Sequence, residues 1–116
     1  MNTVAVKSQI DEIVSKITDY IHPERIILFG SFAQGTANED SDLDLLVIVP
    51  DSSLPRYKRS VPIYKMLSGY NFSKDILVYT QQEIDKYKDI QNTFVYEVLN
   101  TGRVVYSSVI PAKAGI

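Results

Sequence analysis

The chain has no cysteine and only one histidine among its 116 residues. The first absence excludes disulfides, thiolate zinc sites and cysteine nucleophiles. The second excludes His-rich metal sites and most histidine-dependent catalytic triads. No apolar run approaches the ~20 residues that a membrane span needs, and the first residues lack the basic-then-apolar pattern of a signal peptide. We therefore expect a cytoplasmic protein with no membrane partner, whose chemistry uses carboxylates, hydroxyls, Lys/Arg and an oxygen-seeking metal.

The composition is that of one folded domain. Hydrophobic residues make up 45% and charged residues 22% of the sequence, which is ordinary for a globular protein. We assign residues 1–106 to this domain and residues 107–116, which carry Pro111 and Gly115 without periodicity, to a frayed or disordered tail. The net charge of −2 argues against general nucleic-acid binding but allows a small basic cleft.

Hydrophobic periodicity predicts alternating helices and strands. The expected strands are 25–30, 43–49, 76–79 and 103–106. The expected helices are 4–21, a short one starting at Ser31, 55–69 with a kink or restart at Pro62, 81–89 with Thr80 as its N-cap, and one from Phe94 that closes at Gly102. This order predicts an α/β (α+β) fold, in which a small mixed β-sheet carries flanking helices.

Two short motifs carry the candidate chemistry. Gly30-Ser31 closes the first predicted strand, ten residues follow, and then Asp42 and Asp44 open the second. Because side chains alternate along a strand, both carboxylates face the same side; they repel each other unless a cation or a proton intervenes. Oxygen ligands select Mg²⁺ or Mn²⁺. Gly30 would let a phosphate approach the backbone, and a helix starting at Ser31 would offer it N–H groups. The motifs predict nucleoside triphosphate chemistry.

Asp75 opens the third predicted strand and is the candidate third acid. If the segment after Pro55 is a crossover, the second and third strands run parallel and their acids meet at one sheet end. Neighbouring strands are ~4.8 Å apart, a span that metals with carboxylate ligands can bridge. Asp75 would then ligate a metal near the attacking hydroxyl, act as its general base, or both.

Each of these residues also has a purely structural interpretation. The motifs would be a turn and a solvated strand end, Asp75 a salt-bridge partner, and the eight tyrosines packing residues. A calcium loop starting at Asp40 is excluded, because its sixth position needs glycine and this chain has Leu45.

The spacing of Gly30-Ser31 and Asp42-Leu43-Asp44 resembles the signature of the polymerase β-like nucleotidyltransferases, and residues 28–31 and 41–45 resemble the minimal nucleotidyltransferase (MNT) branch. The resemblance covers roughly residues 8–106. It implies two Mg²⁺ ions and transfer of a nucleoside monophosphate to a hydroxyl. Gly30 and Ser31 would bind the triphosphate, Asp42 and Asp44 the metals, and Asp75 would be the third acid. Many MNT proteins are antitoxins that adenylylate a tyrosine of a helical HEPN ribonuclease toxin.

One position departs from the family pattern. Members often carry arginine just before the glycine that matches Gly35, and this chain has Gln34 there. The candidate replacements for that cation near the triphosphate are Arg56, Lys58, Arg59, Lys65 and Lys74.

The sequence thus predicts a Mg²⁺-dependent nucleotidyltransferase that passes AMP from ATP to a hydroxyl, a tyrosine for preference, of a HEPN toxin. Two alternatives remain open: a catalytically weak module that neutralises a toxin by contact, and a transferase acting on a small-molecule hydroxyl. A homo- or hetero-oligomer is expected with a partner, since so short a domain lacks a second lobe to cover its cleft.

Overall fold

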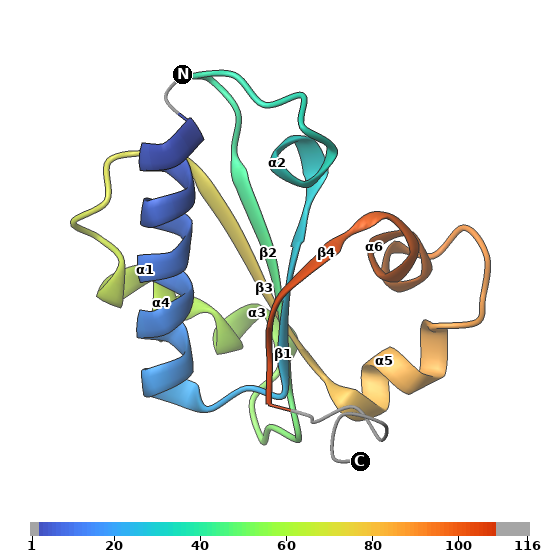
Figure 1. Cartoon of the computed structure of the whole chain (residues 1–116). Helices are drawn as coiled ribbons and strands as arrows, with labels where there is room; N and C mark the ends of the chain where they lie inside the picture. The colour runs from blue at the N-terminus through green and yellow to red at the C-terminus, as the bar shows by residue number, and fades with distance from the viewer. Residues whose placement is uncertain (1–2, 109–116) are drawn as a thin grey trace, which may run out of the picture.

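The computed structural model describes residues 3–108, which form a four-stranded mixed sheet with helices on both faces (Figure 1). The elements are α1 (Thr3–Ile21), β1 (Arg25–Phe29), α2 (Gly30–Gln34), β2 (Leu43–Val49), α3 (Arg56–Arg59), α4 (Val61–Met66), β3 (Lys74–Thr80), α5 (Gln81–Tyr87), α6 (Phe94–Thr101) and β4 (Arg103–Ser107). Strand β4 includes Ser107, the first residue of the predicted tail, and residues 109–116 of that tail lie outside the described residues.

The strand order is β3-β2-β1-β4. Strand β1 is antiparallel to β2 and β4, whereas β2 and β3 are parallel. Helices α3 and α4 lie between β2 and β3 in the chain and form the crossover that a parallel pair requires. The mixed sheet predicted from the sequence is therefore confirmed, including the parallel pair on which the meeting of the acids depends.

The sheet buries side chains on both faces. Leu45 and Val47 of β2 join the core beneath α1 and α4, whereas Leu46 and Ile48 join the core beneath α5 and α6. This explains why β2 is a continuous apolar run and not an alternating one, since a strand covered by helices on both faces has no solvated side.

Helix α1 is amphipathic, with Ile13 and Ile17 fully buried against the sheet. It ends before Pro23, and His22 takes a positive φ of 48° there. Within residues 3–108, no helix is both long enough and apolar enough to cross a bilayer.

Local capping sets the remaining helix boundaries. Pro62 lies in the first turn of α4, so the predicted interruption is a restart after α3 and not a kink. Thr80 caps α5 as predicted: its side chain accepts from the Glu83 N–H, while the Glu83 carboxylate accepts from the Thr80 N–H at 2.8 Å. Helix α5 ends at Tyr87, two residues before the predicted end.

Candidate active site

Two of the candidate acids are direct neighbours across the parallel strand pair. Asp44 of β2 is in register with Asp75 of β3, and on its other side Asp44 pairs with Phe29 of β1. Asp44 lies two residues before Leu46, and Asp75 two residues before Leu77; both leucines belong to the core beneath α5 and α6. Because residues two apart on a strand share a face, both carboxylates lie on that face of the sheet. The structure thus brings these acids together at one end of the sheet.

Asp42 lies one residue before β2 and is exposed, as is Asp75, whereas Asp44 is half-buried between them. Burial raises the pKa of Asp44, and the negative charges of Asp75 and Asp42 raise it further. The three carboxylates are therefore close enough to repel one another electrostatically. A bound cation would relieve that repulsion.

Gly30 packs directly against Asp44. Its φ is +71°, a conformation that favours glycine, and a Cβ added there would stand 2.2 Å from the Asp44 Oδ2. The sequence predicted that Gly30 leaves room for a phosphate. In the structure the Asp44 carboxylate occupies the space that a side chain would take, so Gly30 also fixes the position of this acid.

Helix α2 starts at Gly30, one residue earlier than predicted, so Ser31 lies in its first turn and Phe29 is the N-cap. Gly35 ends the helix with a φ of 76°, and its N–H donates to the Ser31 carbonyl. The Gln34 Nε2 donates to the Thr101 carbonyl at 3.2 Å. Gln34 therefore anchors α2 to the end of α6, at the position where the family resemblance led us to expect an arginine.

Arg59 and Lys74, two of the five candidate replacement cations, are held by contacts with other parts of the chain. The Arg59 Nη1 pairs with the Glu83 Oε1 at 2.6 Å, and its side chain is only 10% exposed. The Lys74 Nζ donates to the carbonyls of Tyr70 and Phe72, at 3.0 Å and 3.2 Å. Neither side chain is free to reach a phosphate at Gly30.

Arg56 and Lys58 lie on α3, which packs against β3 and is thus separated from Gly30 by the two acid-bearing strands. One basic residue that the sequence did not single out does contact α2: the Arg103 Nη2, from β4, donates to the Ala33 carbonyl at 3.4 Å.

Sequence reasoning missed Tyr64 of α4, which it treated as a packing residue. The Tyr64 hydroxyl accepts from the Ile76 N–H at 2.7 Å, at the free edge of β3 and next to Asp75. Burial raises the pKa of Tyr64, and the charges of Asp75 and Asp44 raise it further, against the lowering effect of the Ile76 N–H. The Tyr64 hydroxyl therefore lies close enough to both acids to interact with their charges. Helical spacing alone could not have revealed this contact.

The candidate ligands suit a Mg²⁺ ion that binds together with a nucleotide. In the described part of the chain, no group of three or more His, Asp or Glu side chains forms a metal cage by itself. Mg²⁺ seldom uses such cages, and instead takes one or two carboxylates and completes its shell with water and substrate phosphates. Asp44, with a neighbouring carboxylate from Asp42 or Asp75, would supply the one or two oxygen ligands of a Mg²⁺ that arrives with a nucleotide.

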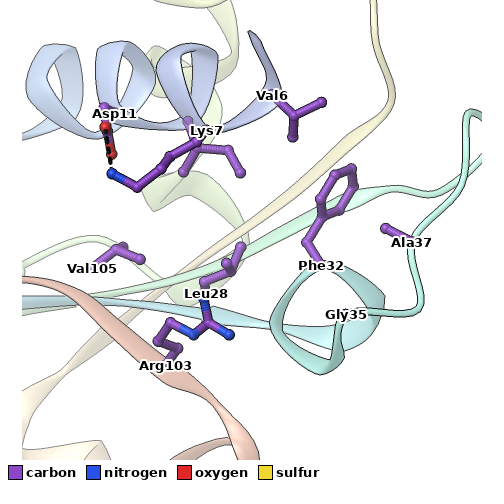
Figure 2. Close-up of a pocket in the computed structure, with 10 residues that line it drawn as sticks. Val6, Lys7, Asp11, Leu28, Phe32, Gly35, Ala37, Arg103 and Val105 are labelled. Atoms are coloured by element: carbon purple, nitrogen blue, oxygen red, sulfur yellow. Dashed lines mark ion pairs between the residues drawn. The ribbon is translucent and has the colours of Figure 1, made fainter. Parts of the chain in front are cut away.

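The candidate acids Asp42, Asp44 and Asp75 do not line the apolar cavity of about 370 Å³ between α1, α2 and β4 (Figure 2). The cavity lies on the α1 side of the sheet, because its lining includes Leu28, which belongs to the core beneath α1. Figure 2 shows Lys7 turned toward Asp11, with which it forms a 3.5 Å ion pair, and Arg103 beside Leu28. The candidate active site is therefore the open end of the sheet on the opposite face.

The chain is similar to known proteins of one family. The family described as "Polymerase beta, Nucleotidyltransferase" matches residues 9–109. Two proteins of Methanocaldococcus jannaschii are similar in sequence. "Putative protein adenylyltransferase MJ0141" is 39% identical over 79 residues, which cover 68% of this chain and 75% of that protein. "Putative protein adenylyltransferase MJ0604" is 34% identical over 102 residues, which cover 88% of this chain and 95% of that protein.

Two solved structures share the fold. A nucleotidyltransferase from Sulfolobus solfataricus, described as putative, matches with a TM-score of 0.61 at 20% identity and covers 93% of this chain and 91% of its own. A toxin–antitoxin crystallised with AMP-PNP matches with a TM-score of 0.59 at 22% identity and covers 84% of this chain and 73% of its own.

Proposed function

The chain belongs to the polymerase beta nucleotidyltransferase family, and from that premise we propose that it transfers AMP from ATP to a hydroxyl of a partner protein. The observation that carries the proposal is the meeting of Asp44 and Asp75 on neighbouring strands, with Gly30 packed against Asp44. The names of the two archaeal relatives support protein as the acceptor class.

In this proposal Asp42 and Asp44 would hold the Mg²⁺ that binds with the nucleotide, and Asp75 would ligate a metal near the acceptor hydroxyl. When bound, Mg²⁺ neutralises charge on the triphosphate and on the leaving pyrophosphate. The backbone N–H groups at Gly30 and Ser31, with the Ser31 hydroxyl, bind the triphosphate on the β1 side of Asp44. This places the nucleotide on the first of the three strands that form the site.

The acceptor hydroxyl belongs on the opposite side, at Asp75. Strands β1 and β3 flank β2 and are therefore about 10 Å apart, so the donor and acceptor halves of the reaction rest on different strands. Asp75, which lies next to the Tyr64 hydroxyl, accepts the proton of the acceptor hydroxyl as its oxygen bonds to the α-phosphorus of ATP and the bond to pyrophosphate breaks.

We further propose that the partner is a toxin of the HEPN class and that a tyrosine accepts the AMP. The MNT-like sequence motif supports this identification, and so does the fold shared with a component of a toxin–antitoxin pair. The complex would be hetero-oligomeric, because the acids lie at an open sheet end that a partner can cover.

A second function, neutralisation by contact without catalysis, is favoured by one observation. Position 34 holds a glutamine committed to the Thr101 carbonyl, not a cation available to the triphosphate. A weakened enzyme could still block a toxin by occupying its surface.

The test is to incubate the protein with labelled ATP, Mg²⁺ and the product of the neighbouring gene. We expect label on the partner, reduced roughly 100-fold or more by Asp42→Asn or Asp44→Asn. Asp40→Asn, an exposed carboxylate in the same loop, is the matched control and should keep the wild-type rate. Absence of transfer by the wild-type protein would contradict the proposal. Full protection of cells by both inactive variants would favour neutralisation by contact.

A further inference from the structure

We propose that a basic surface along β3 from Asp75 docks an acidic segment of the partner that carries the acceptor tyrosine. This surface, the α3 patch, consists of Arg56, Tyr57, Lys58 and Leu77, over the buried ring of Tyr79. The inference rests on the proposed function, since it names the chemistry of the protein that the same site would modify.

The α3 patch begins next to the acids. Leu77 follows Asp75 by two residues on the same face of β3, which is about 7 Å along the strand. Beside it, α3 and β3 enclose a groove of about 420 Å³ that is lined in part by Arg56, Tyr57 and Tyr79. Asp75 does not line the groove, and Arg56 contacts β3 at Tyr79, four residues or about 13 Å further along the strand. The groove lies on the β3 side of the site, away from Gly30, where an acceptor must approach if the triphosphate lies at Gly30.

The side chains of the patch are of the kind found at protein interfaces. Tyr57 is 75% exposed, the largest exposed fraction among the exposed large hydrophobic residues of the described chain. The Arg56 guanidinium lies 4.4 Å from the centre of the Tyr79 ring and donates to its hydroxyl at 3.0 Å. Tyrosine and arginine are enriched among residues that dominate protein–protein binding. Held in this way, Arg56 is pre-organised for contact.

The charge of the patch predicts the chemistry of the partner. Helix α3 carries three cations in four residues, in a chain whose net charge is −2. Arg59 is neutralised by Glu83, whereas Arg56 stands 3.8 Å from the same carboxylate with 47% of its side chain exposed. Arg56 and Lys58 thus present positive charge to solvent on the acceptor side of the site. A segment with acidic residues next to its tyrosine would complement them.

The experiment uses two short fluorescein-labelled peptides with one central tyrosine, flanked by glutamates in the first and by lysines in the second. Binding to the full chain is measured by fluorescence anisotropy at low salt. We expect the glutamate peptide to bind about tenfold more tightly. The double variant Arg56→Gln/Lys58→Gln should abolish that preference, whereas Lys7→Gln/Lys16→Gln, which removes two positive charges from α1 across the sheet, should keep it. Lys58→Glu, which leaves the Arg56 contacts intact, should reverse the preference.

Equal affinity for the two peptides would overturn the inference, as would a preference that survives in both α3 variants. So would a short single-stranded RNA that binds more tightly than the glutamate peptide and loses binding in the same double variant. AMP transfer from ATP to each peptide separates this inference from the proposed function. Equal transfer to both peptides would reject the docking surface alone, whereas selective binding with no transfer would reject the enzymatic function alone.

Discussion

Gly30 and Gly35 share a left-handed backbone conformation, and together they provide a matched test of the packing between Gly30 and Asp44. Gly30 has a φ of 71° and Gly35 a φ of 76°, so alanine at either position pays the cost of the left-handed conformation. Only at Gly30 does the added Cβ collide, 2.2 Å from the Asp44 Oδ2; at Gly35 nothing lies within 4 Å. The difference between Gly30→Ala and Gly35→Ala therefore isolates the contact with Asp44.

The left-handed conformation costs an alanine roughly 1–2 kcal/mol, which is the expected loss in the free energy of unfolding for Gly35→Ala. Gly30→Ala must also displace the Asp44 side chain, and overpacking of this kind adds about 1–3 kcal/mol. We expect total losses of ~1 kcal/mol at Gly35 and ~3 kcal/mol at Gly30. Because the displaced carboxylate is a candidate metal ligand, AMP transfer should fall at least tenfold more in Gly30→Ala than in Gly35→Ala.

Urea denaturation and the transfer assay are measured on both variants, and denaturation also in an Asp44→Ala background. Removing the carboxylate there should reduce the cost of Gly30→Ala to that of Gly35→Ala. Equal costs of the two glycine substitutions in the wild-type background would refute the reasoning. An unchanged cost of Gly30→Ala when Asp44 is absent would refute it as well.

Three further predictions follow from the contacts of the site and of its supporting shell. Tyr64→Phe should lower kcat for AMP transfer about tenfold and leave KM for ATP within twofold, because the lost hydroxyl bonds to the Ile76 N–H beside Asp75, on the acceptor side of the site. Burial alone would raise the pKa of Glu83, but the net shift is downward, because its carboxylate bonds to Arg59 and the Thr80 N–H and lies near the charges of Arg59 and Arg56. Glu83 therefore stabilises the fold at pH values above its unfolded pKa, and this stabilisation is lost as the pH falls through its folded pKa. Glu83→Gln should therefore cost ~2 kcal/mol at pH 7, or about 8 °C in Tm, and less at pH 3. The contribution of Asp44 to stability depends on pH in the opposite direction. Burial, and then the neighbouring charges, raise the pKa of Asp44, so its stabilising effect is present at low pH and is lost as the pH rises. Asp44→Asn should raise the free energy of unfolding at pH 7 without metal, and leave it unchanged at pH 3, in urea titrations at both values.

Most of the fold was predictable because its signals are local. The apolar run of residues 43–49, the proline after His22 and the Thr80 cap each act within a few residues of themselves, and the elements they predict are present. The parallel pairing of β2 and β3 followed from one crossover. Boundaries shifted by one to three residues, as at β3, which starts at Lys74 because its first residues pair with β2 ahead of the apolar run.

The site was predictable only where the strand pattern determines it. Asp42, Asp44 and Asp75 could be placed together because a side chain's face follows from its position along a strand. Contacts between distant segments had no such rule. The bond from Gln34 to the Thr101 carbonyl joins residues 67 positions apart, and the contact of Tyr64 with the edge of β3 depends on where α4 packs. Such contacts depend on tertiary packing, which no spacing rule encodes.

The most direct test of the account measures ATP affinity and AMP transfer together in Asp75→Asn. If Gly30, Ser31 and the β2 acids hold the nucleotide while Asp75 serves the acceptor, this variant binds ATP with Mg²⁺ within about threefold of the wild type and transfers AMP to the partner at least ~100-fold more slowly. AMP transfer at the wild-type rate would contradict the division of the site between the two strands. So would a loss of ATP affinity large enough to account for the whole reduction in AMP transfer.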